Sequence, residues 1–141
     1  MVRKQKIDQK IDEILKQHDT RDPFKIAKEK GIVVLFEELG DIFGYYNRVC
    51  RIPFIHINCN LPYEKQIFTC IHELGHVIFH PDENTPKLSE VSLCSEIIIE
   101  AEANYFATRF LIDGSHCDHY IETKRQLLQY YGLPKQMERF L

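Results

Sequence analysis

The stretch CIHELGHVIFH, residues 70–80, places two histidines on successive turns of a predicted helix, with a glutamate directly after the first. Helix side chains four positions apart lie one above the other, so His72 and His76 can bind one metal ion together. Glu73 lies at the adjacent edge, beside any water on that ion. Imidazole suits zinc, which lowers the pKa of a bound water towards ~7 so that a neighbouring carboxylate can take its proton. The motif therefore predicts a catalytic zinc site with Glu73 as the general base.

So short a motif also arises by chance, and a third metal ligand is the test of its meaning. His80 is the nearest candidate, but it lies about 12 Å from His72 along the axis of a straight helix. Ligand bonds near ~2 Å do not span that distance. We therefore expect His80 to be a helix C-terminal histidine, which the helix dipole favours.

A second predicted helix, SEIIIEAEANYFATRFLI, offers a glutamate as the third ligand. At roughly 100° per residue, Glu100 and Glu102 point about 200° apart, so only one of them faces the metal. Glu102 shares its side with Tyr105 and Arg109, which predicts a solvent-facing position. Glu100 shares its side with small and apolar residues, where a carboxylate is costly unless it is paired or binds metal. Glu100 is therefore the predicted ligand, and Asn104 on the same side is placed to fix the tautomer of a ligand histidine.

The surrounding patterns predict an α+β domain with a small mixed sheet. Asp22-Pro23 is a favourable helix start and Gly31 a favourable helix end. Pro53 predicts either an edge strand, to which a peptide substrate could add as a further strand, or the first residue of a strand. Gly75 costs roughly 1 kcal/mol against Ala inside a helix, which predicts that another backbone packs closely there. The expected elements are helices over 4–18 and 23–30, a buried strand over 32–37, strands over 44–50 and 51–58, the motif helix over 62–80, a polar loop over 81–94, the second helix over 95–112 and two short helices over 120–141.

Composition limits the classes of protein that fit. The 141 residues, with 44% hydrophobic and 28% charged side chains, suit one globular domain over 1–141, with 114–141 as a C-terminal helical segment packed on it. A net charge of -3 argues against direct nucleic-acid binding, and no apolar run is long enough for a membrane span. The N-terminus lacks a signal-peptide core, and the five cysteines show no disulfide pattern. We therefore expect a cytoplasmic protein whose cysteines are mostly small core residues.

Two lesser groups also carry reactive side chains. Tyr45 and Tyr46 could polarise a scissile carbonyl, although packing is their expected role. A solvated loop is the expected structure for a second cluster of metal-binding residue types, and a second metal there is the alternative. This cluster consists of His116, Cys117, Asp118 and His119.

HELGH followed by E-A-E-A-N-Y-F-A, residues 100–107, resembles the ImmA/IrrE metallopeptidases. The resemblance extends to D-P-F-K-I-A-K-E-K-G-I, to F-I-H-I-N and, more weakly, to Q-L-L-Q-Y-Y-G-L-P, so it covers most of the chain. It implies a gluzincin-like zincin domain in which His72, His76 and Glu100 bind zinc and Glu73 is catalytic. It also implies a protein substrate, since many members cleave a helix-turn-helix repressor of a phage or mobile element and others act in stress responses.

The predicted function is therefore that of a zinc-dependent endopeptidase that cleaves one specific intracellular protein. The alternative is a zinc-containing binding module that inactivates a repressor by contact, without proteolysis. A structural zinc site closes its fourth position with a protein ligand, and the sequence offers no obvious one. The presence of Glu73 also favours chemistry over simple binding.

Overall fold

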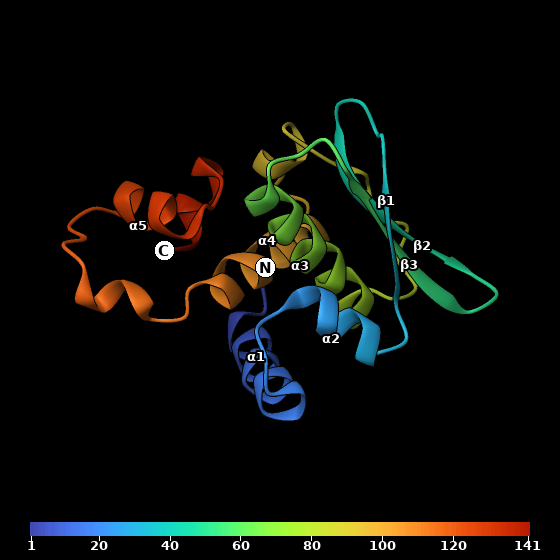
Figure 1. Ribbon diagram of the computed structural model, residues 1–141, viewed down its shortest axis with the longest axis horizontal. Coiled ribbons are helices and arrows are strands. Elements are labelled where there is room, and N and C mark those ends of the chain that lie inside the picture. Colours follow the sequence, from blue (N-terminus) through green and yellow to red (C-terminus); the bar gives the residue numbers. More distant parts are fainter.

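The computed structural model describes residues 1–141, which form helices packed against one face of a small sheet (Figure 1). The helices are α1 Lys4–His18, α2 Pro23–Glu29, α3 Tyr63–Phe79, α4 Ile98–Leu111 and α5 Lys124–Tyr131. The strands are β1 Val33–Glu37, β2 Ile42–Val49, β3 Ile52–Asn58 and β4 Leu88–Ser89. Short 3₁₀ turns cover Ser92–Cys94, Ser115–Asp118 and Lys135–Phe140. This is the predicted α+β class, and every helix is too short or too polar to cross a membrane.

The two N-terminal helices have the predicted boundaries. α1 buries one face, which carries Ile7, Ile11 and Ile14. Asp22 caps α2, because its carboxylate accepts hydrogen bonds from two backbone N–H groups of the first turn. Gly31 follows the end of α2 with a φ of +76°, a conformation that glycine adopts without strain.

The sheet has the strand order β1-β3-β2-β4, so β3 is an interior strand. It pairs in parallel with β1 and antiparallel with β2. The prediction that Pro53 marks an edge strand or a first residue is wrong, and β3 has no open edge on which a peptide could add. Proline is tolerated here because the ladder with β1 begins only at Phe54, opposite Val33, so at Pro53 the strand pairs with β2 alone.

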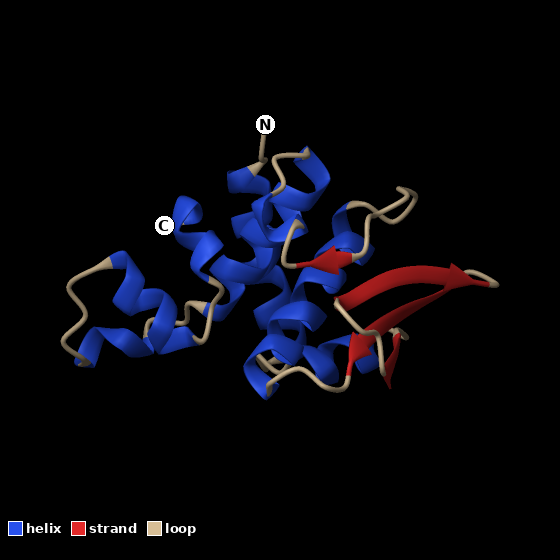
Figure 2. Ribbon diagram, turned by 90° about the horizontal axis from the view of Figure 1, so that it is seen from above, coloured by secondary structure: helices blue, strands red, loops and turns tan.

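β1 is an edge strand and largely exposed, although its apolar run predicts a buried one. Helices cover only one face of the sheet (Figure 2). Ile55 and Ile57 of β3 point to the covered face and are fully buried. Val33 and Leu35 of β1 are 37% and 38% exposed. The prediction of a buried strand is wrong because a short apolar run occurs both in strands buried on two faces and in edge strands with one open face.

α3 lies between the sheet and α4, and a glycine on each side allows the close approach. A Cβ on Gly44 of β2 would lie 2.5 Å from the Thr69 side chain of α3. A Cβ on Gly75 of α3 would lie 3.0 Å from the ring of Phe106 and 3.5 Å from the Cα of Ala103, both on α4. The predicted close packing of a second backbone at Gly75 is therefore confirmed. These contacts fix the motif helix against both neighbours.

The segments that follow α3 and α4 return to the same core. β4 and the first 3₁₀ turn lie within the stretch that the sequence predicts as a loop. Arg139 donates hydrogen bonds to the carbonyl oxygens of residues 93, 94 and 95, which ties the C-terminal turn to that stretch. Leu128, Leu133 and Met137 belong to the hydrophobic core that also contains α1 and α3 side chains.

All five cysteines are free, but the expectation that most are core residues is wrong. Only Cys70 of α3 is buried. Cys50 and Arg51 form the turn between β2 and β3, where both have positive φ, +51° and +69°. The other exposed cysteines, Cys59, Cys94 and Cys117, also lie in turns or at the ends of elements. Connecting segments run over the surface, so an apolar residue type there stays exposed.

Candidate metal centre

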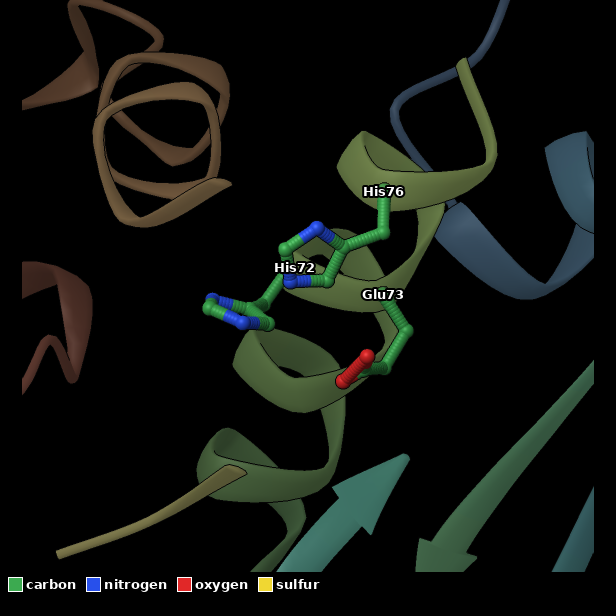
Figure 3. A group of neighbouring side chains, drawn as sticks. All are labelled: His72, Glu73 and His76. Atoms are coloured by element: carbon green, nitrogen blue, oxygen red, sulfur yellow. The ribbon is translucent and has the colours of Figure 1, made fainter. Parts of the chain in front are cut away.

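α3 presents the three motif side chains in one buried cluster (Figure 3). His72, Glu73 and His76 are each 0% exposed. One possible ligand atom from each lies within 4.8 Å of the others. Figure 3 shows the two imidazole rings on one side of the helix, with the Glu73 carboxylate beside them. The spacing of four positions thus has the predicted effect on the helix.

Glu100 reaches the same cluster from the first turn of α4. Its side chain is fully buried. Its Oε1 lies 2.7 Å from Nε2 of His76, and its Oε2 lies 3.4 Å from Nε2 of His72. The contact depends on the close packing of α3 and α4 at Gly75. The structure therefore brings the predicted Glu100 to both predicted histidine ligands.

Both imidazoles face Glu100 through Nε2, and their Nδ1 atoms contact other side chains. Nδ1 of His72 lies 2.8 Å from Oδ1 of Asn104, and Nδ1 of His76 lies 3.0 Å from Nδ1 of His80. An amide oxygen only accepts, so His72 donates through Nδ1 and keeps a lone pair on Nε2. Asn104 thus contacts His72, one of the two histidines that the sequence predicts as metal ligands.

The residues present fit a bound cation. Nε2 of both histidines and both carboxylate oxygens of Glu73 and Glu100 are buried without a hydrogen-bond partner. Buried polar atoms nearly always have a partner, and acceptors that face one another without a donor are costly. A metal ion satisfies these acceptors together, and imidazole with carboxylate is a donor set that suits zinc.

Burial and proximity shift the pKa values of the cluster. Burial raises the pKa of Glu73 to about 8, an effect that His72 reduces and Glu100 reinforces. Burial lowers the pKa of His76 to about 4, which keeps the imidazole neutral, the form that binds metal. Burial alone would raise the pKa of Glu100, but the two nearby imidazoles lower it to about 2. Glu100 is therefore ionised at neutral pH.

The prediction that Glu102 faces solvent is wrong, because it is 1% exposed. Its Oε2 accepts hydrogen bonds from the backbone N–H and from Nε of Arg3, at 2.9 and 2.8 Å. Its Oε1 accepts from Nη2 of Arg3 and from Nε2 of His80, both at 2.9 Å. Burial acts to raise the pKa of Glu102, but these hydrogen bonds outweigh it and lower the pKa to about 2. The helical periodicity correctly predicts that Glu102 points away from Glu100. It does not show that Arg3 and His80 cover that side of α4.

His80 follows α3 directly, as predicted for a helix C-terminal residue. It is nevertheless 4% exposed, and it joins the ring of His76 to Glu102. Sequence reasoning missed this connection. The spacing of four between His76 and His80 was the only signal for it, since Arg3 lies 99 positions from Glu102.

The tyrosines near the glycine turn have packing contacts. The Tyr46 hydroxyl donates a hydrogen bond to the carbonyl oxygen of Pro81, at 3.0 Å. The Tyr45 ring stacks on the ring of His56, with a centroid distance of 4.2 Å. The expected packing role agrees with both contacts.

The second group of metal-binding residue types, 116–119, is mostly exposed; its first three residues lie in the 3₁₀ turn Ser115–Asp118, and His119 directly follows that turn. Nδ1 of His116 lies 2.7 Å from the hydroxyl of Tyr131. The side chains of this turn do not converge on one point as those of His72, Glu73 and His76 do.

A buried His-Glu-His cluster on one helix is the arrangement that the H-E-x-x-H motif gives metallopeptidases. Residues 27–140 match the IrrE N-terminal-like domain of the Peptidase_M78 family. The chain therefore belongs to the ImmA/IrrE family of metallopeptidases.

Two curated relatives cover most of the chain. The chain is 35% identical over 115 residues to "Uncharacterized immunity region protein 2" of Bacillus phage phi105, which covers 81% of this chain and 73% of that protein. It is 28% identical over 135 residues to "Metallopeptidase ImmA" of Bacillus subtilis (strain 168), which covers 91% of this chain and 79% of that protein. One relative is thus named for a peptidase and the other for a phage immunity region.

Proposed function

We propose that the chain is a zinc-dependent endopeptidase of the gluzincin type, with His72, His76 and Glu100 as metal ligands and Glu73 as the catalytic residue. The observation that carries the proposal is the set of buried acceptor atoms without partners between α3 and α4. Membership of a metallopeptidase family supports it.

The choice of zinc follows from the donor set. Two imidazoles and one glutamate are the protein ligands of a known kind of catalytic zinc site, which keeps its fourth position for water or substrate. Asn104 holds His72 through Nδ1, so that Nε2 is free for the metal. A structural zinc site would need a fourth protein ligand in this position.

Glu73 carries the proton transfers of the proposed reaction. Zinc, when bound, supplies Lewis-acid activation of water and of the scissile carbonyl. Glu73 accepts the proton that the attacking water loses and delivers it to the leaving amine. Its two oxygens have no hydrogen-bond partner in the protein, so no bond must break before it acts. Burial raises its pKa to about 8 in the metal-free protein, and a bound cation would favour the ionised form that accepts a proton.

The proposed substrate is a helix-turn-helix transcriptional repressor of a phage or mobile element. The phage relative is named for an immunity region, and the other relative is named a metallopeptidase. A repressor maintains phage immunity, so a peptidase that acts in this setting has that repressor as its natural target. Cleavage would switch on the genes that the repressor silences.

The test is co-expression with the repressor-like protein encoded beside this chain, followed by intact-mass measurement of the repressor. The wild type is compared with Glu73→Gln, which keeps the side-chain shape but removes the base. Glu64→Gln is the matched control, because Glu64 is an exposed glutamate on the same helix. Zinc content of all three proteins is measured in parallel.

We expect one cut in the repressor with the wild type and Glu64→Gln, and none with Glu73→Gln, while all three retain zinc. A repressor that stays intact but loses DNA binding in the presence of Glu73→Gln and wild type alike would contradict proteolysis. That result would favour inactivation by contact instead.

A further inference from the structure

A chain of hydrogen bonds connects His76 to the surface of the protein. Nδ1 of His76 lies 3.0 Å from Nδ1 of His80, and Nε2 of His80 lies 2.9 Å from Oε1 of Glu102. Three donors of Arg3 then bind the same carboxylate. His76, His80 and Glu102 are buried, whereas the Arg3 side chain is 45% exposed.

With a neutral His80 ring, the chemistry of these groups sets the position of each proton. Arg3 only donates, so Glu102 is ionised and only accepts. His80 must therefore donate to Glu102 through Nε2, and a neutral His80 ring then accepts at Nδ1. His76 donates to it through Nδ1, which leaves the lone pair of its Nε2 directed at Glu100.

We infer that Arg3, Glu102 and His80 are positioning residues that hold His76 in the tautomer and ring orientation required of a metal ligand. The inference rests on the proposed metal site. Groups that bind the far nitrogen of a ligand histidine typically change metal affinity by 10–100-fold. His72 has one neutral amide in this position, while His76 is held by a chain that ends in an ion pair.

The outer end of this chain belongs to the N-terminal segment. Arg3 directly precedes α1, and it lies before residues 27–140, the part of the chain that matches the family domain. α1 also contacts α4 independently, because the Tyr105 hydroxyl donates a hydrogen bond to Asp8 at 2.9 Å. The N-terminal segment thus has side-chain hydrogen bonds to α4 at Glu102 and at Tyr105, and only those of Arg3 with Glu102 lead to the proposed metal site.

The substitution Glu102→Gln should exchange the donor and acceptor roles in the hydrogen bonds between residue 102, His80 and His76. The backbone N–H and Nε of Arg3 hold the amide oxygen at the position of Oε2, so the NH₂ group lies at the position of Oε1, where it faces His80 and no longer accepts from Nη2 of Arg3. His80 must then accept at Nε2 and donate through Nδ1. The proton of His76 moves to Nε2, where it blocks metal binding.

The test measures zinc affinity by competition with a chromogenic chelator in the wild type, Glu102→Gln, Arg3→Gln and Tyr105→Phe. Tyr105→Phe is the matched control, because it removes the hydrogen bond between Tyr105 of α4 and Asp8 of α1. Ring ¹⁵N NMR of the metal-free proteins reports the tautomer of His76. His72→Ala establishes that the zinc measured is bound at this site.

We expect Glu102→Gln to bind zinc more weakly by on the order of 10–100-fold, with the His76 proton on Nε2. Arg3→Gln should show a smaller loss, roughly tenfold, because the backbone N–H still binds Glu102. Arg3→Gln alters only a half-exposed side chain, so we expect this variant to fold. If Glu102→Gln does not fold, the zinc affinity of Arg3→Gln tests the inference. Tyr105→Phe should bind zinc as the wild type does.

Wild-type zinc affinity and an unchanged His76 tautomer in Glu102→Gln would overturn the inference, as would wild-type affinity in Arg3→Gln if that variant alone folds. An equal loss in Tyr105→Phe would overturn it too, by showing a general loosening of α1. These results leave the proposed function intact. Failure of the wild type to bind zinc, or full binding by His72→Ala, would refute the metal site and the inference with it.

Discussion

Glu100 and Glu102 of α4 are both fully buried carboxylates, but their surroundings differ completely. Glu100 faces the Nε2 atoms of His72 and His76, and neither of its oxygens has a hydrogen-bond partner. Glu102 faces α1 and His80 and accepts four hydrogen bonds, three from Arg3 and one from His80. One helix thus carries an unsatisfied carboxylate on one side and a fully satisfied one on the other.

The difference shows how burial alone misleads a search for functional residues. A buried carboxylate needs a cation, but the cation can be a metal ion or an arginine of the same chain. What distinguishes Glu100 is the absence of any donor for its oxygens. The comparison therefore predicts that substitutions on the Glu100 side change metal binding, and that substitutions on the Glu102 side also change the stability of the metal-free fold.

Removal of the Glu100 carboxylate should have the largest effect. Zinc at about 100 times its Kd should raise the free energy of unfolding of the wild type by about 2.7 kcal/mol. We expect Glu100→Ala to lose this stabilisation, because the metal loses a ligand. Denaturant unfolding with and without zinc measures it, with exposed Glu96→Ala as the control. Zinc stabilisation that persists in Glu100→Ala would contradict the role of this residue.

On the opposite side of α4, Glu102→Gln should lower the free energy of unfolding of the metal-free protein by about 1–3 kcal/mol, since it leaves buried donors with poorer partners. Urea unfolding in the presence of a chelator measures this effect. Unchanged stability would show that the hydrogen bonds to Arg3 and His80 contribute nothing to the fold.

Asn104 offers a milder test of the Glu100 side. Asn104→Ala should weaken zinc binding by on the order of 10–100-fold, because Nδ1 of His72 loses its acceptor. Asn104→Asp keeps an oxygen at this position and should retain most of the affinity. Equal affinities in both variants would indicate that the acceptor oxygen does not orient His72.

The smallest effect is expected at Tyr105, on the α1 side of the helix. Tyr105→Phe should cost about 0.5–1.5 kcal/mol of stability, the usual value of one hydrogen bond. Burial, with a contribution from Asp8, raises the pKa of Tyr105 from 10.0 to about 12. The protonated Tyr105 hydroxyl therefore contributes fully to the free energy of unfolding below pH 10.0, and this contribution is lost as the pH rises towards 12. Unfolding measured across this range should show the loss in the wild type and not in Tyr105→Phe.

Local patterns predicted the helices and one side of the site. Asp22-Pro23 marks the start of α2, Gly75 indicates close helix packing, and the apolar neighbours of Glu100 indicate its burial. Each of these signals lies within a few positions of the feature it predicts. The geometry around Glu100 and Asn104 agrees with the prediction for this reason.

The features that sequence reasoning missed depend on distant partners. Glu102 is covered by Arg3 and His80, which no periodicity of α4 reveals. Pro53 suggests an edge, but the strand order is set by the parallel pairing of β1 with β3. The exposure of Cys50 follows from its place in a turn. In each case the tertiary arrangement, and not local propensity, decides the outcome.

The hydrogen bonds between Arg3 and Glu102 join residues 99 positions apart in the sequence. Contacts of such long sequence separation form late, because the intervening chain must first be ordered. During synthesis, α3 and its histidines leave the ribosome well before α4 and before Arg3 can find its partner. We therefore expect a newly made chain to bind its metal ion tightly only after α4 has been synthesised and has packed against α3 and Arg3, so that the topology of the fold sets the timing of metal loading.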